Sequence, residues 1–131
     1  MKGIVMRFRR GMTVTAAAGA ALVLAATPAF AGSDLSMETG GGGYGGALFH
    51  HEGETVTVCD FARDGKAVTA YLGFFEPTGS RRVRVTNAKG AGGGCVTKDF
   101  SVVEGSRVVM QVCLRQGSTL SHCSARRWTT A

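Results

Sequence analysis

The sequence predicts an all-β fold, a small antiparallel β-sandwich of two sheets that is held together by two disulfides. Three observations favour this class. Apolar and polar residues alternate along several Val-rich and Thr-rich segments, turn residues recur between those segments at fairly even spacing, and the chain contains four cysteines. No segment shows the apolar spacing of an amphipathic helix.

Residues 1–31 have the order of parts that is typical of a cleavable signal peptide. Basic residues lie among the first ten, an uncharged Ala-rich run spans 11–26, and Ala29-Phe30-Ala31 supplies small residues for cleavage after Ala31. This run of 16 residues is shorter than the roughly 20 that a transmembrane helix needs. The pair Arg9-Arg10 leaves both the general secretory and the twin-arginine routes open. We expect a secreted, extracellular protein with no membrane anchor after cleavage.

Residues 32–53 show no structural period and include the glycine-rich run 40–46. Glycine loses more conformational entropy on ordering than any other residue. We therefore predict a flexible tail over 32–53, followed by one folded domain over 54–131.

The folded domain is predicted to contain six strands, at 54–60, 67–76, 82–86, 95–103, 106–114 and 122–129. Asp64-Gly65, between the first two strands, predicts a type I′ turn. Alternation assigns the apolar side of the strands to the core, which would consist of Val56, Val58, Val68, Ala70, Leu72, Phe74, Val83, Val85, Val108, Met110, Val112 and Leu114. The other side of the third and fifth strands is mostly polar. A sheet with one hydrated face needs a second layer on its apolar face, which favours a sandwich.

All four cysteines lie in the predicted folded domain, and an even number in an exported chain is typical of disulfides. We expect Cys113 to pair with Cys123, because they flank a short loop between neighbouring strands, and Cys59 to pair with Cys95. Pairing of Cys59 with Cys113 stays open, because both lie opposite the aliphatic side of their strands. The spacings do not fit a zinc site.

Removal of residues 1–31 would lower the net charge to +2, because 11 of the 15 basic residues and all nine acidic residues remain. A candidate binding surface consists of Arg82, Arg84, Arg107, Arg126 and Trp128. An anionic cell-wall polymer or a secreted protein would be its partner, since these arginines are too few for nucleic acid. The alternative is an ordinary hydrated sheet face, with Trp128 covering the core beside Cys123.

No residue grouping in the sequence points to catalysis or to a cofactor. His122 is the only histidine of the predicted folded domain, and the nucleophile motif Gly-x-Ser-x-Gly is absent from the sequence. His50-His51-Glu52 has metal-ligating side chains, but a flexible segment would give them no fixed geometry. We expect a protein that is not an enzyme and has no catalytic, cofactor or metal site.

The pattern of Thr57-Val58-Cys59-Asp60, Gly94-Cys95, Val112-Cys113 and Cys123-Ser124 resembles small secreted proteins of unknown function from high-GC Gram-positive bacteria. The resemblance covers residues 54–131 and implies an extracellular compartment and a β fold. It carries over no functional residue.

The leading hypothesis is a non-catalytic extracellular domain that binds the cell envelope or another protein. The alternative is an inhibitor of a secreted hydrolase, with the loops at 77–81 and 87–94 as its candidate contact segments.

Overall fold

The computed structural model describes residues 32–131, so the predicted signal peptide lies outside the described residues. These residues form nine strands: β1 (Leu35–Glu38), β2 (Gly45–His50), β3 (Thr55–Asp60), β4 (Ala67–Glu76), β5 (Gly79–Asn87), β6 (Val96–Asp99), β7 (Arg107–Gln116), β8 (Thr119–Ser121) and β9 (Arg127–Thr130). Within this part of the chain no helix occurs, and hence none that could span a membrane.

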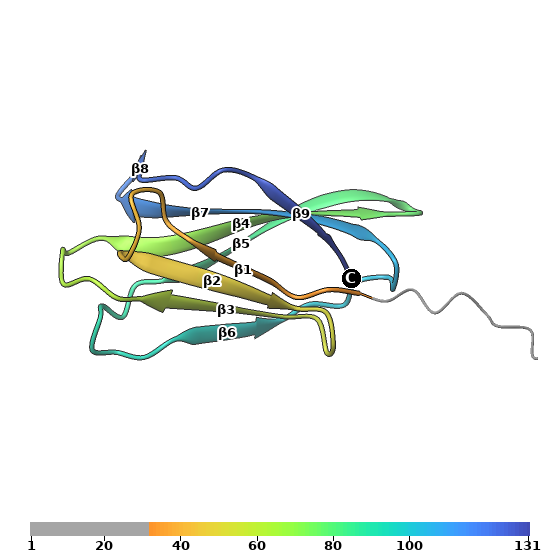
Figure 1. Ribbon diagram of the computed structural model, residues 1–131, viewed down its shortest axis with the longest axis horizontal. Helices are drawn as coiled ribbons and strands as arrows, with labels where there is room; N and C mark the ends of the chain where they lie inside the picture. Colours follow the sequence, from red (N-terminus) through yellow and green to blue (C-terminus); the bar gives the residue numbers. More distant parts are fainter. Residues whose placement is uncertain (1–31) are drawn as a thin grey trace, which may run out of the picture.

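The strands form two antiparallel sheets that pack face to face (Figure 1). One sheet has the order β1-β2-β3-β6. The other has the order β5-β4-β7, and both β8 and β9 pair with β7. The predicted all-β two-sheet sandwich is therefore confirmed.

The core lies between the sheets and follows the predicted alternation. Val56, Val58, Phe74 and Val108 have no exposed surface. Every other residue of the predicted core is also buried, except Val83, which is half-buried and packs against the core. Each buried aliphatic side chain contributes about 1.5 to 3 kcal/mol to the free energy of unfolding.

The prediction of a flexible tail over 32–53 is wrong, because this segment supplies β1 and β2. Met37, Ala47 and Phe49 from these strands are buried in the same core. Gly45 in β2 packs so closely against β4 that an added Cβ would lie 2.4 Å from Val68 Cγ2. Glycine therefore serves close packing at this position, whereas the glycines at 41–43, in the turn before β2, have positive φ angles.

Three other predictions of local structure are wrong. Asp64-Gly65 does not join a hairpin, because β3 and β4 belong to different sheets and only Gly65 has a positive φ. The strand predicted at 95–103 is shorter in the structure, where β6 covers only Val96–Asp99. The predicted strand at 122–129 is interrupted, since Ser124 takes over the hydrogen bonds of Val112 in β7: the Ser124 amide donates to the Val112 carbonyl at 2.8 Å, and the Ser124 hydroxyl accepts from the Val112 amide at 3.0 Å.

The structure contains the expected disulfides Cys59–Cys95 and Cys113–Cys123, so the alternative Cys59–Cys113 pairing is wrong. The first bond connects β3 to the loop that precedes β6. The second connects β7 to the segment that follows β8. Two disulfides in a small domain are typical of an oxidising compartment.

Candidate binding face

The outer face of the five-stranded sheet carries the candidate site. Because side chains alternate along a strand, the burial of Leu72 and Phe74 in β4 turns Tyr71, Gly73 and Phe75 outward. We call the outward side of β5, β4, β7 and β9, together with Arg126, the binding face.

The strand register brings the predicted surface residues together on this face. Gly73 lies opposite Arg82 of β5 on one side and opposite Val109 of β7 on the other, and Val109 in turn lies opposite Trp128 of β9. Arg84 lies opposite Tyr71, two residues before Gly73 in β4. The binding face thus has a floor on β4 and β7 and two walls, on β5 and on the segment 126–128.

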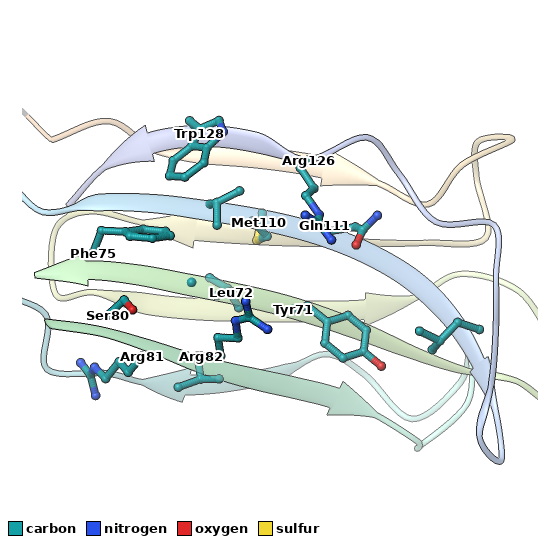
Figure 2. Close-up of a pocket in the computed structure, with 14 residues that line it drawn as sticks. Tyr71, Leu72, Phe75, Ser80, Arg81, Arg82, Met110, Gln111, Arg126 and Trp128 are labelled. Carbon is teal, nitrogen blue, oxygen red and sulfur yellow. The ribbon is translucent and has the colours of Figure 1, made fainter.

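A hollow of about 390 Å³ lies on the binding face, at the lower end of the size of ligand pockets. Figure 2 shows Phe75 and Tyr71 at its two ends, while Arg82 and Arg126 extend from opposite walls toward its middle. Gly73 lies in the floor, where the side chains of Val109 and Phe75 occupy the space that a side chain of its own would need. A Cβ there would lie 2.9 Å from Val109 Cγ1 and 3.3 Å from Phe75 Cε2.

Exposed aromatic side chains border the hollow. Phe75 is 45% exposed and Trp128 is 49% exposed, and their ring centroids are 5.2 Å apart. The Arg107 guanidinium lies 4.3 Å from the Trp128 ring centroid, within the range of a cation–π interaction. The expectation that Trp128 covers the core is wrong, because β9 turns its side chain to the outer face.

The binding face carries positive charge that no acidic side chain compensates. Arg82, Arg84, Arg107 and Arg126 are exposed, and in residues 32–131 no carboxylate forms a salt bridge with any of them. Neighbouring Arg81 differs, since its Nε donates to Glu76 Oε1 at 2.8 Å. The lining of the hollow contains no carboxylate at all. The four guanidiniums are therefore free to donate hydrogen bonds to an incoming anion.

In the run His50-His51-Glu52, the two histidines belong to an ordered contact around Asp34, not to a flexible segment. His50 Nδ1 lies 3.1 Å from Asp34 Oδ2, and His51 Nδ1 lies 2.6 Å from Asp34 Oδ1. The His51 backbone amide donates to Asp34 Oδ1, and this bond is the main cause that lowers the pKa of Asp34. These contacts fasten the segment before β1 to the end of β2.

The remaining candidate residues are separated from one another. His122 follows β8, away from the hollow, and its ring centroid lies 4.9 Å from that of Tyr44. Within the described residues no group of three or more His, Cys, Asp or Glu side chains could hold a metal ion. Of the two candidate inhibitory segments, 77–81 includes the short β4–β5 turn, and 87–94 is fastened by the Asn87 side chain.

Sequence reasoning identified the basic residues of the binding face but missed Tyr71, Gly73, Phe75 and Leu120. The signal for the first three was present. If Leu72 and Phe74 point into the core, the outer face of β4 must carry Gly73 with one aromatic residue before it and one after it. No protein-family model, curated protein or solved structure matches this chain.

Proposed function

We propose that residues 32–131 form a non-catalytic extracellular binding module and that the binding face holds an anionic polymer of the cell envelope. The observation that carries the proposal is the gathering of Arg82, Arg84, Arg107 and Arg126, without carboxylate partners, on the face that holds the apolar hollow, which Arg82 and Arg126 line. An extracellular place of action agrees with the two disulfides.

An anionic partner follows from the charge of the face. Guanidinium groups form charge-assisted, often bidentate, hydrogen bonds with carboxylates and phosphates. Like charges that face one another across a hollow repel, and an anion between them removes that repulsion. Arg82 and Arg126 stand in this relation on the opposite walls.

An extended partner follows from the shape of the face. Arg82 and Arg84 lie two residues apart on β5, which separates them by about 7 Å along the strand. Arg126 and Trp128, on the opposite side of the hollow, are also two residues apart in the sequence. A chain with repeating charges fits the row of Arg82 and Arg84, with Arg126 across from it, better than a single small ion does.

A non-catalytic role agrees with the chemistry of the lining. The hollow is bordered by aromatic, aliphatic, arginine, serine and glutamine side chains, with no histidine, carboxylate or cysteine that could serve as a general base. The face lies on paired strands of a disulfide-linked sandwich. It is therefore built to hold its partner without a large rearrangement.

Retention on purified cell envelope as a function of salt tests the proposal. We expect retention that weakens as salt rises, because screening reduces the attraction between exposed charges. The double variant Arg82→Ala/Arg84→Ala should bind at least about tenfold more weakly. The matched control Arg63→Ala/Lys98→Ala removes two exposed charges outside the binding face and should bind nearly as well as the unmodified protein.

Two outcomes would contradict the proposal. Retention that is independent of salt would exclude an electrostatic face. Equal losses in both double variants would mean that net charge, and not the binding face, drives retention. Recovery of a stoichiometric complex with a secreted hydrolase, unaffected by Arg82→Ala/Arg84→Ala, would instead favour the inhibitor.

A further inference from the structure

The lining of the hollow on the binding face specifies the anion more closely than the charge of the face alone. Resting on the proposed function, we infer that the hollow is a subsite for a pyranose ring that carries a carboxylate, so that the polymer is a uronic-acid polysaccharide. The aromatic side chains supply the contact for the ring, and the arginines supply the contact for the carboxylate.

The aromatic side chains point to a ring-shaped ligand. Phe75, Trp128 and Tyr71 border the hollow, and Leu120 and Val109 add apolar surface. The C–H face of a sugar ring is apolar and packs against an aromatic ring, whereas its hydroxyl rim stays polar. A polymer of phosphates joined by short acyclic linkers has no such face, and it would leave this apolar surface without a partner.

The floor of the hollow limits what can lie there. The Phe75 ring leans over Gly73, within 3.3 Å of the position that a Cβ would occupy, and Val109 closes the other side. Phe75 and Tyr71 lie four residues apart on β4, so their Cα atoms are separated by about 13 Å. This distance accommodates one or two sugar units along β4, in keeping with a volume of about 390 Å³.

The two walls place a guanidinium on either side of that ring. Arg82 comes from β5, and Arg126 comes from the segment before β9 (Figure 2). The carboxylate of a uronic acid projects from the edge of its ring, where it can accept two parallel hydrogen bonds from one guanidinium. In a β-1,4-linked uronic-acid chain, successive carboxylates point to opposite sides. Such a chain lying along β4 would place carboxylates beside both walls, toward Arg82 and toward Arg126.

The direct test is calorimetric titration of residues 32–131, with both disulfides formed, with three soluble ligands of matched length. These are a uronic-acid oligosaccharide, the same oligosaccharide with its carboxylates reduced to alcohols, and inorganic polyphosphate. We expect the uronic-acid oligosaccharide to bind at least about tenfold more tightly than either of the others, since each lacks one of the two contacts.

Variants assign the two contacts to their residues. Arg82→Ala should weaken uronic-acid binding about tenfold and leave the weak binding of the reduced oligosaccharide unchanged. Arg82→Lys should restore only part of the loss, because lysine keeps the charge without the planar pair of donors. Phe75→Ala or Trp128→Ala should weaken both oligosaccharides and spare polyphosphate. The control Phe61→Ala removes a phenylalanine that is 57% exposed elsewhere and should change neither.

The outcomes separate this inference from the proposed function. Polyphosphate binding that equals or exceeds uronic-acid binding, and that depends on Arg82, would overturn the uronic-acid subsite and leave an anion-binding face. Equal binding of the reduced and unreduced oligosaccharides would overturn the role of the arginines. No binding of any anionic ligand, at low salt and with folding verified by circular dichroism, would remove both proposals.

Discussion

The side-chain amide of Asn87 in β5 donates a hydrogen bond to the carbonyl oxygen of Val58 in β3, at 3.0 Å, and so joins the two sheets across the interior. The same Nδ2 donates to the Gly94 carbonyl at 2.9 Å, and Asn87 Oδ1 accepts from the Lys89 amide at 3.0 Å. Asn87 has no exposed surface. One polar residue thereby fixes β5, a wall of the binding face, to β3 and to the loop before Cys95.

Replacing this amide should destabilise the whole fold. Asn87→Ala would leave the Val58 carbonyl without that donor, and an unsatisfied buried polar group costs about 1 to 3 kcal/mol. Urea unfolding should show a loss of this size. The control Thr97→Ala removes only the 2.9 Å hydroxyl contact with Thr57 on the exposed side of β3, and its effect should be well below 1 kcal/mol. Equal losses in the two variants would refute the role assigned to Asn87.

Phe49 tests whether the segment before residue 54 belongs to the folded domain. Its ring is fully buried, 6.5 Å from the ring centroid of Phe74. Phe49→Ala should lower the free energy of unfolding by about 3 to 5 kcal/mol, as expected for a large aromatic side chain in a core. Phe61→Ala, at an exposed position, should cost far less. An unchanged unfolding midpoint for Phe49→Ala would contradict the position of β2 in the core.

The two disulfides should contribute unequally to stability. Cys59–Cys95 spans 36 residues and Cys113–Cys123 spans ten. The loop-entropy model assigns them about 4 and about 3 kcal/mol, because a longer closed loop restricts the unfolded chain more. Thermal unfolding of the double variants Cys59→Ala/Cys95→Ala and Cys113→Ala/Cys123→Ala should therefore rank the first as less stable. The reverse order would show that packing of the buried Cys113 side chain outweighs chain entropy.

Asp34 should make stability depend on pH in the acid range. The hydrogen bond from the His51 backbone amide, followed by that from the His51 ring, lowers the pKa of Asp34 from its ordinary value of 3.8. A carboxyl group with a lower pKa in the folded state adds stability above its unfolded pKa, and it loses this contribution as the pH falls through its folded pKa. Below about pH 5, the unmodified protein should thus lose stability more steeply than Asp34→Asn. Parallel curves of stability against pH would contradict this assignment.

Much of the fold was predictable because β alternation directly reports burial. The inward residues of β4 and β7, from Val68 to Phe74 and from Val108 to Leu114, lie in the core as their spacing indicated. The disulfide pairing followed from the short loop between Cys113 and Cys123. A strand with one face against the core has an apolar residue at every second position. This alternation is clear in the sequence of the long strands β4 and β7.

The features that the sequence did not predict depend on contacts between distant residues, and such contacts produce no repeating pattern in the sequence. Gly45 and Gly46 resemble flexible sequence, yet close contact with Val68 and with the Met37 carbonyl leaves no room for a side chain at these positions. The interruption at Ser124 depends on a side chain that substitutes for a strand partner of Val112. The sequence indicated the arginines of the candidate site. Their assembly with Phe75 and Trp128 required the strand order β5-β4-β7-β9, which no single strand encodes.

Among the described strands, β5 pairs only with β4, so its other side is a free sheet edge, and it is the strand that carries Arg82 and Arg84. Exposed edges invite edge-to-edge association of identical molecules, and charged side chains on such an edge oppose it by mutual repulsion. The same guanidiniums would then help to keep the protein dispersed in solution. Neutralising them, by substitution or by a bound polyanion, should promote self-association, which light scattering at increasing protein concentration would detect.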